Sequence, residues 1–398
     1  MKRIFTFLVL LFFACSLQAQ FTTLNQGKIK QKKYLQEISY QEIVGYIIIP
    51  VTINGKVYKF LFDTGATLAI SDKIYKELNL KVIRQINAVD ASGEGKPISF
   101  ILLPEIDIQG ITFRNTPGAV FHENSDASKL AECLGIDGII GSNMLRNSLV
   151  QFDAQKKQII IANDIKNILP PNSKYQKIKL SFWQKAPFIN ITMQKGVQKV
   201  ENSVLFDTGD NGRLFTLSLN ELNDSVVEVL AESEGSFSIG AHGFYNKQRH
   251  LLLRIPELVV NRLIFTDVIA TTTQDKKSRL GVKFLQYGKT TLDYKKKRFY
   301  FEPFDNIKTD ELSEMPRAVD FNVQNNKLVV GIIWDKQLES KINLGDVVLS
   351  INGVDLQSMG FCELFMLDIP YREEQILELR DINTGEIKNV EILRFLAN

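Results

Sequence analysis

The sequence predicts a mainly β protein with two homologous halves, followed by a small α+β unit. Short apolar runs of strand length alternate with turns rich in glycine and asparagine, which is the pattern of a β protein. The segment 61–66, Leu-Phe-Asp-Thr-Gly-Ala, returns at 205–210 as Leu-Phe-Asp-Thr-Gly-Asp, so the chain contains a repeat. After residue 305 the composition changes and a third group of strand-like runs begins.

Residues 1–20 have the pattern of a secretory signal peptide. Lys2 and Arg3 precede a short apolar core, and Ala19 offers a small residue for cleavage. The apolar core is too short to span a bilayer comfortably, and no other segment is apolar enough for a transmembrane helix. Lipidation of Cys15 is an alternative, which Phe12 disfavours because that position usually carries leucine. In both cases we expect an exported chain, periplasmic or extracellular.

The length of 398 residues allows two or three domains, and the apolar content of 44% allows a sizeable core. The net charge of +3 is small for this length, so it gives no argument for nucleic acid or an acidic membrane surface. Besides Cys15, the cysteines are Cys133 and Cys362. They lie far apart in the sequence, and we expect both to be free, buried thiols.

The first half covers 45–169, after a polar, lysine-rich stretch at 21–44 for which we expect a solvated lead-in. Asn54 and Gly55 form a favoured pair for a two-residue hairpin turn, and Ser71 is a favoured helix N-cap. The expected elements are strands at 46–53 and 57–62, a helix at 72–78, a glycine-rich loop at 90–95, strands at 98–103 and 106–113, and a closing hairpin of 149–153 and 158–162.

A Pro-Pro-Asn-Ser break precedes the second half, 174–305, in which the same parts return in the same order. Gly281 follows Asp207 at nearly the interval at which Gly141 follows Asp63. A coincidental turn motif would not bring its whole neighbourhood with it, so we infer an internal duplication. The expected elements are strands at 188–193 and 204–206, a capped short helix at 218–222, a glycine-rich loop at 238–243, strands at 251–255 and 258–264, and a closing hairpin at 291–301.

Each copy of the repeat places one carboxylate, Asp63 or Asp207, between a buried strand and a glycine-containing loop. If the two loops face each other, two carboxyl groups share one site. Ionising both carboxyl groups at short range is unfavourable because like charges repel, so the pair shares a proton and one pKa rises. Such a pair can act as base and as acid in one reaction, which the attack of water on an amide requires.

At these residues the chain resembles the pepsin and retropepsin superfamily of aspartic proteases, over roughly 46–303. The resemblance rests on the paired Asp-Thr-Gly, on the later apolar-apolar-Gly segment and on the closing hairpin. It implies a bilobal all-β fold of two duplicated, barrel-like halves, with the active site between the lobes.

The resemblance also implies roles for individual residues. Asp63 and Asp207 would be the catalytic dyad. The threonines of the repeat would hydrogen-bond across the lobe interface, and its glycines would let the two backbones approach. The residues that support the dyad would then be Thr64, Gly65, Thr208 and Gly209. The loops that close over substrate, the flaps, would include Ser92, Gly93, Glu94, Gly240 and His242.

Several residues depart from the family pattern. Ala66 looks like the retroviral branch, which often works nearer neutrality, so we expect no strongly acidic optimum. Asp210 stands where the family usually has Ser, Thr or Ala, and Arg279 replaces the first apolar residue before Gly281. The first flap lacks the tyrosine of pepsins. These departures leave an alternative open, a catalytically inactive protease homologue that acts as an extracytoplasmic peptide-binding adaptor.

The last unit, 315–398, resembles a PDZ domain of bacterial secreted proteases in its segment 345–354, Gly-Asp-Val-Val-Leu-Ser-Ile-Asn-Gly-Val. We expect a strand at 328–333, a helix at 361–367 and a hairpin across 383–385. PDZ domains bind extended peptides by adding a strand to a sheet edge. No clear carboxylate-binding loop precedes the first strand, so a unit that only packs against the protease is the alternative.

The sequence has no Cys-x-x-Cys, His-Glu-x-x-His, phosphate-binding glycine loop or Gly-x-Ser-x-Gly elbow. The histidines His122, His242 and His250 are too scattered for a metal site, and we expect neither metal nor cofactor. The predicted function is an exported aspartic-type endopeptidase that acts on peptide or protein substrates, with a peptide or partner ligand for the PDZ-like unit.

Overall fold

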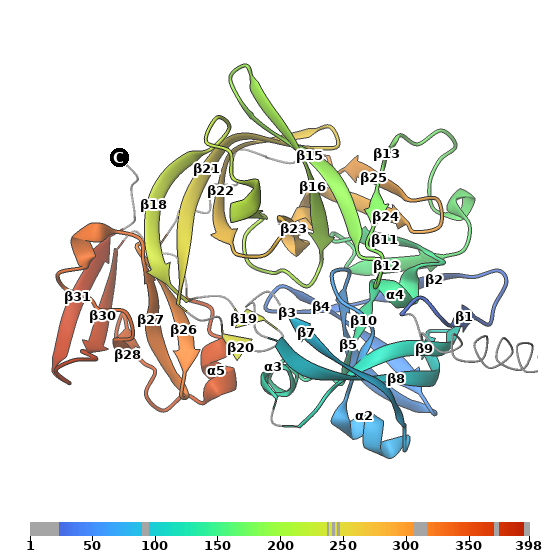
Figure 1. The fold of residues 1–398 in the computed structure, drawn as a ribbon, viewed down its shortest axis with the longest axis horizontal. Coiled ribbons are helices and arrows are strands. Elements are labelled where there is room, and N and C mark those ends of the chain that lie inside the picture. Colours follow the sequence, from blue (N-terminus) through green and yellow to red (C-terminus); the bar gives the residue numbers. More distant parts are fainter. Residues whose placement is uncertain are drawn as a thin grey trace, which may run out of the picture.

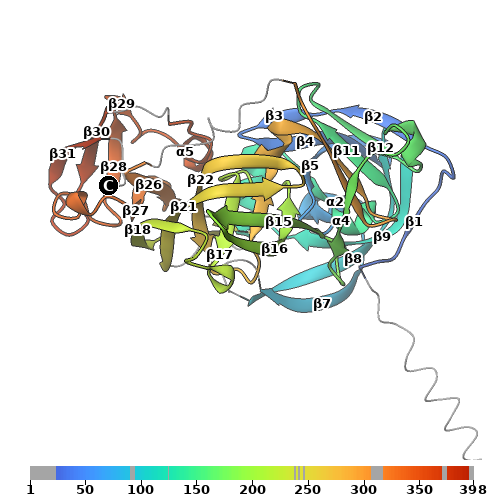
Figure 2. The same ribbon diagram turned by 90° about the horizontal axis from the view of Figure 1, so that it is seen from above.

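The computed structural model describes residues 24–89, 95–123, 125–236, 239–240, 243–244, 247–305, 317–369 and 374–393. The protein is mainly β, as predicted. Figure 1 shows the sheets of the two repeats side by side, with the C-terminal unit, the described residues from 317 onward, at one end of the molecule. The view from above in Figure 2 again places this unit at the end of the long axis.

The predicted leader, with Cys15, lies outside the described residues. Within the described part of the chain, no helix is both long and apolar enough to cross a bilayer. The predicted lead-in contains three strands that the sequence did not predict, because their apolar residues are few and two of them pair with strands far along the chain. These strands are β1 (Lys28–Ile29), β2 (Leu35–Ser39) and β3 (Gln41–Ile43).

The first half forms one nine-stranded sheet, together with short helices. The predicted hairpin turn is present, with φ of 49° at Asn54 and 76° at Gly55. The predicted cap is present too, because the Ser71 side chain accepts from the backbone N–H of Ile74. The elements are β1, β3, β4 (Tyr46–Ile53), β5 (Lys56–Asp63), β6 (Ala69–Ser71), α2 (Asp72–Glu77), β7 (Val82–Val89), β8 (Gly95–Ile108), β9 (Ile111–Phe121), α3 (Asp126–Leu134), β10 (Gly138–Gly141) and α4 (Ser142–Leu145).

Strand β8 is longer than the sequence predicted, because it continues through Pro104 instead of breaking there. The ladder with β9 is paired on both sides of the proline. The chain turns at Gln109 and Gly110, whose φ values of 45° and 94° suit a tight hairpin.

The second half repeats this arrangement in an eight-stranded sheet. Parallel pairing sets Gly281 opposite Asp207, just as it sets Gly141 opposite Asp63. The two repeated aspartates therefore end equivalent strands. The elements are β14 (Lys179–Leu180), β15 (Pro187–Lys195), β16 (Gln198–Asp207), β17 (Phe215–Ser218), η2 (Leu219–Glu221), β18 (Glu228–Gly235), β21 (Gln248–Val260), β22 (Leu263–Thr273), β23 (Arg279–Gly281) and η3 (Val282–Tyr287), with a separate hairpin of β19 (Ile239–Gly240) and β20 (Gly243–Phe244).

A six-stranded sheet joins the two halves, because the closing hairpin of one pairs with the closing hairpin of the other. Its strands are β13 (Tyr175–Lys177), β25 (Arg298–Pro303), β24 (Gly288–Asp293), β11 (Leu149–Asp153), β12 (Gln158–Ala162) and β2, and η1 (Ile165–Asn167) follows β12.

Buried phenylalanine rings connect the strand ends through this joint. Phe62 and Phe206 precede the repeated aspartates, and both lie against Phe152, with ring centroids 5.5 and 6.4 Å away. All three side chains are fully buried. Edge-to-face pairs of this kind contribute about 0.5–1.5 kcal/mol beyond the area that they bury. The core between the halves therefore fixes the two strand ends relative to each other.

The C-terminal unit has its own sheet and its own apolar core. The strand, helix and hairpin that the sequence predicted here are all present. The elements are β26 (Val319–Gln324), β27 (Lys327–Ile333), η4 (Lys336–Leu338), β28 (Val347–Ile351), β29 (Val354–Asp355), α5 (Phe361–Phe365), β30 (Glu374–Arg380) and β31 (Ile387–Leu393).

Backbone contacts attach this unit to β18 of the second half, beside which it lies in Figure 1. The Ser236 N–H donates to the Gly331 carbonyl at 3.0 Å. The side-chain amide of Asn322 donates to the Ser236 carbonyl at 2.7 Å. A side chain on Gly331 would overlap Ser236, so the close approach requires glycine. Trp334 is buried in this contact, in a cluster with Leu252.

A disulfide attaches the same unit to the first half, so the prediction of free thiols is wrong. Cys133 of α3 and Cys362 of α5 are bonded, with their Cα atoms 4.8 Å apart. Phe365 of α5 packs against an apolar cluster of the first half that includes Leu134. The sequence separation of 229 residues concealed the pairing, because separation along a chain sets no lower limit on distance in the fold.

Candidate active site

The two repeated aspartates lie together at the junction of the halves. Gly65 and Gly209 make this approach possible. A Cβ built on Gly65 would lie 2.5 to 2.7 Å from the carboxyl atoms of Asp207, and one on Gly209 would overlap the carboxyl of Asp63. A hydrogen bond joins the Asp63 and Asp207 carboxyl groups. Each loop therefore holds its carboxyl against the glycine of the other.

Thr64 and Thr208, both fully buried, connect the loops by four hydrogen bonds with two-fold symmetry. The Thr64 hydroxyl donates to the Phe206 carbonyl at 2.6 Å and accepts from the Thr208 N–H at 3.0 Å. The Thr208 hydroxyl donates to the Phe62 carbonyl at 2.8 Å and accepts from the Thr64 N–H at 3.0 Å. Each hydroxyl thus satisfies one buried donor and one buried acceptor of the other half.

The two carboxyl groups accept different numbers of hydrogen bonds from the backbone. Asp63 Oδ1 accepts from the N–H groups of Gly65 and Ala66, at 2.7 and 2.9 Å. Asp207 Oδ1 accepts from the N–H of Gly209 at 3.0 Å. Hydrogen bonds from N–H groups favour the ionised form of a carboxyl. The arrangement stabilises negative charge on Asp63 more than on Asp207.

Burial raises the pKa of both groups. For Asp63 the rise is partly offset by the hydrogen bond with Asp207 and by the backbone donors. For Asp207, burial and then the charge of Asp63 hold the pKa well above its ordinary range. The pair therefore titrates as a unit that retains one proton when ordinary aspartates have lost theirs.

Two further side chains contact the loop of Asp63, with a third behind one of them, and sequence reasoning did not single them out. The Gln184 amide donates to the Gly65 carbonyl at 2.5 Å. Ser142 donates to the Thr64 carbonyl at 2.7 Å and lies 2.8 Å from the Tyr294 hydroxyl. Ser142 was detectable in principle, because it directly follows the Gly141 that pairs with Asp63.

Tyr46 faces the site from β4. Ile48 pairs with Leu61 in the antiparallel ladder of β4 and β5, and continuing that register sets Tyr46 opposite Asp63. Residues opposite each other in a sheet point to the same face. Burial, and then the neighbouring carboxylates, raise the pKa of Tyr46, so its phenol remains protonated beside them.

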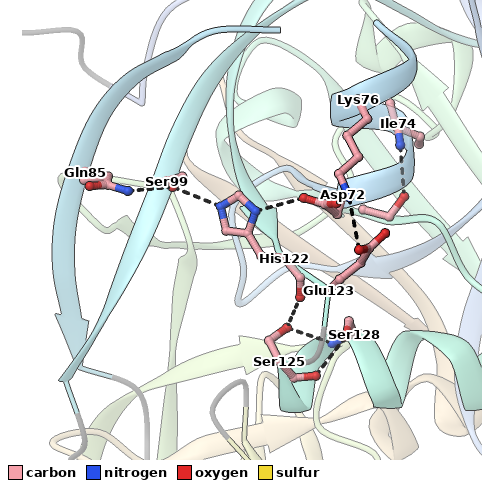
Figure 3. Close-up of polar contacts among 10 residues, drawn as sticks. Asp72, Ile74, Lys76, Gln85, Ser99, His122, Glu123, Ser125 and Ser128 are labelled. Carbon is pink, nitrogen blue, oxygen red and sulfur yellow. Dashed lines mark hydrogen bonds and ion pairs between the residues drawn. The ribbon is translucent and has the colours of Figure 1, made fainter. Parts of the chain in front are cut away.

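The predicted flap residues Ser92, Gly93, Glu94 and His242 lie outside the described residues. Gly240 lies in β19, which forms a two-stranded hairpin with β20. Strand β8, which follows the first predicted flap, is fixed by His122, as Figure 3 shows. The two ring nitrogens of His122 lie 3.0 Å from Ser99 Oγ and 3.0 Å from Asp72 Oδ1.

This Ser–His–Asp contact is not a second catalytic site. Ser99 is 2% exposed and its hydroxyl also receives a hydrogen bond from Gln85, so a substrate has no access to it. Burial raises the pKa of Asp72, but hydrogen bonds from Lys76 and His122 outweigh it and keep that pKa below its ordinary value. The network connects α2, β8 and β9.

In the described residues, no group of three or more His, Cys, Asp or Glu side chains is arranged to hold a metal ion.

A comparison with known protein families identifies one part of the chain. A family model described as aspartyl protease matches residues 49–144, which include the first Asp-Thr-Gly. No curated protein matches the chain. Among solved structures, a retropepsin-like aspartic protease from Rickettsia conorii is similar at 20% identity over 33% of this chain and 95% of its own, with a TM-score of 0.25. A TM-score of 0.25 is too low to support a shared fold, so the functional assignment relies on the family match and on the site geometry.

Proposed function

We propose that the protein is an aspartic-type endopeptidase in which Asp63 and Asp207 are the catalytic dyad. The observation that carries the proposal is the close approach of these two half-buried carboxyl groups, each held against the glycine of the opposite loop. A half-buried pair that keeps one proton offers a base and an acid at the same site. The aspartyl protease match over residues 49–144 supports the same reaction class.

In the proposed reaction, a water molecule lies between the two carboxyl groups. The ionised carboxyl takes a proton from this water as it attacks the scissile carbonyl carbon. The protonated partner donates to the carbonyl oxygen, which gives a tetrahedral diol. A proton then passes to the leaving nitrogen, the C–N bond breaks, and the pair returns to its singly protonated state.

The test is cleavage of a mixed peptide library by the mature protein and by Asp63→Asn and Asp207→Asn. Both substitutions keep the side-chain shape and remove the shared proton chemistry, so each is expected to abolish cleavage. Asp267→Asn is the matched control, because Asp267 lies at an unpaired position of β22 and 63% of its side chain is exposed. Unchanged turnover in either dyad variant would refute the scheme. Inhibition by a statine-type mimic of the diol is the second expected result.

We also propose three regions: protease lobes at 45–169 and 174–305, in a bilobal arrangement, and a PDZ-like domain at 315–398. Among the described strands, β26 pairs only with β27 and so lies at the edge of its sheet. An edge strand can accept an extended peptide by β-augmentation. Anisotropy titration of labelled peptides into the full-length Asp207→Asn variant tests this role. Peptide binding without any cleavage by the wild-type chain would favour the adaptor alternative.

We propose further that the chain is exported, with residues 1–20 as its leader. The Cys133–Cys362 disulfide supports this, because structural disulfides persist mainly in oxidising compartments outside the cytoplasm. Amino-terminal sequencing of the protein recovered from cell fractions tests the proposal. A mature chain that begins near residue 20 is expected, and an intact leader in the cytoplasmic fraction would overturn it.

A further inference from the structure

The two halves differ in charge at one pair of equivalent positions beside the carboxyl groups. In the first half, the residue after Asp-Thr-Gly is Ala66, and Ile139 pairs with the strand that ends in Asp63. In the second half the same two positions hold Asp210 and Arg279. Both halves are otherwise built alike here, so the first half provides an uncharged reference for the second.

The register orients Arg279 toward the site. It pairs with Leu205, two residues before Asp207, and alternate residues of a strand point to the same face. The Arg279 side chain therefore lies on the face of the sheet that carries the Asp207 carboxyl. Its side chain is only 19% exposed, which is low for an arginine.

Arg279 binds two carboxylates at once. Its Nε lies 3.1 Å from Asp210 Oδ2, and its Nη1 lies 2.5 Å from Asp275 Oδ2. These two carboxylate side chains are 15% and 20% exposed, so solvent screens the cluster weakly. Breaking a half-buried pair by removing one partner leaves the other charge uncompensated.

The backbone fixes Asp210 beside the dyad. Its N–H donates to the Asp207 carbonyl at 3.2 Å, and its carbonyl accepts from the Val282 N–H at 2.8 Å. Its side chain accepts from the Gly212 N–H at 3.1 Å. Asp210 is therefore a third carboxylate at a fixed place next to the pair.

The charges act on the pair in opposite directions. Burial and the charge of Asp63 are the largest contributions to the raised pKa of Asp207. Asp210 raises this pKa further, and Arg279 lowers it. Among the described residues, the phenols of Tyr46 and Tyr294 also face the pair, and burial raises their pKa values, so both stay neutral. The loop that carries Asp210 also carries the cationic Arg213.

We propose that Arg279 is a positioning residue whose charge compensates Asp210 and sets the pH range in which the Asp63–Asp207 pair holds one proton. The inference rests on the proposed function for its catalytic consequence, but the charge compensation itself does not require that the chain cleaves peptides. The two departures from the family pattern then form one unit. Asp210 without Arg279 would hold the pair in its fully protonated form to higher pH, and Arg279 without Asp210 would do the reverse.

The test replaces each residue by its counterpart in the first half. Arg279→Ile removes the positive charge that contacts Asp210 and Asp275, so both limbs of the pH–activity profile are expected to move upward, by on the order of one pH unit. Asp210→Ala removes one of the negative charges that contact Arg279, so the profile is expected to move downward. The double variant D210A/R279I keeps the net charge of the cluster and is expected to return close to the wild-type profile.

Two controls separate this role from a structural one. Arg254→Ile on β21 breaks a more exposed ion pair with Glu228 of β18 and is expected to leave the profile in place. Arg279→Lys keeps the charge and is expected to retain the wild-type pH limits even if its kcat falls. A lower rate with unmoved limits in both R279I and D210A would overturn the proposal. If R279I does not fold, the opposite shift expected of D210A still decides the matter.

A readout without catalysis separates the inference from the proposed function. Carboxyl resonances of ¹³C-labelled aspartate in the full chain are titrated, with the Asp207 signal assigned from the Asp207→Asn variant. The Asp207 midpoint is expected to rise in R279I, fall in D210A and return in the double variant. These shifts in a chain that cleaves nothing would refute the peptidase and leave the charge pair standing. Cleavage with an unmoved midpoint would refute the charge pair and leave the peptidase.

Discussion

Removing the hydroxyl of Thr64 is the sharpest stability test of the junction between the halves. Thr64→Val keeps the shape of the side chain, so it creates no cavity. It takes a buried acceptor from the Thr208 N–H and a buried donor from the Phe206 carbonyl. Each buried polar group that loses its partner costs about 1–3 kcal/mol, and the added methyl group offsets about 1 kcal/mol of the sum. We therefore expect a loss of about 1–5 kcal/mol.

The assay is urea unfolding followed by tryptophan fluorescence, with the wild type and Thr64→Val compared at a common slope. Thr290→Val is a matched control, because Thr290 is also fully buried, and its hydroxyl has no hydrogen-bond partner among the described residues. We expect this control to be neutral or slightly stabilising. A Thr64→Val loss within about 0.5 kcal/mol of the control would refute the claim that the crossed threonine bonds hold the loops together.

Three further predictions concern the same junction and the C-terminal unit. Gly65→Ala would set a Cβ 2.5 Å from Asp207 Oδ1, and we expect peptide cleavage to fall at least about a hundredfold, while a wild-type rate would contradict the packing. The double variant C133S/C362S should unfold ~2–4 kcal/mol more easily in urea, and a reductant should weaken the wild type but not the variant. Because the pKa of Asp207 lies above its unfolded value, the folded state binds more protons. Stability should therefore fall as the pH rises from about 4 through the folded pKa. Asp207→Asn should flatten this slope in urea midpoints measured from pH 4 to 7, and an unchanged slope would count against the raised pKa.

The elements that the sequence predicted are those whose cause is local. Asn54 and Gly55 adopt the positive φ values of a tight turn, and Ser71 caps α2 through its own hydroxyl. The repeat itself made the strand ends at Asp63 and Asp207 predictable, because two copies of one local pattern must fold alike. No tertiary information was needed for any of these.

The features that the sequence did not give depend on contacts between distant segments. The side chain of Gln184 reaches the Gly65 carbonyl from a loop of the other half, and nothing around residue 184 marks it as part of a site. Cys133 and Cys362 meet only because α3 and α5 are packed together. Strands β1 and β2 of the lead-in form because β9 and β12, far along the chain, offer them partners. A single sequence carries no record of such pairings.

The duplication has a chemical consequence that follows from the asymmetry of the two loops. Two copies joined in one chain are free to differ, and here they differ in the environment of the two carboxyl groups. Asp63 accepts two backbone N–H bonds, whereas Asp207 accepts one, and the charge of Asp63 raises the pKa of Asp207 further. Both differences place the negative charge on Asp63 and the proton on Asp207. In the proposed reaction, Asp63 is therefore the base that takes a proton from water, and Asp207 is the acid that donates to the scissile carbonyl. The compensation by Arg279 limits this preference, since an Asp207 proton held too tightly would not be donated.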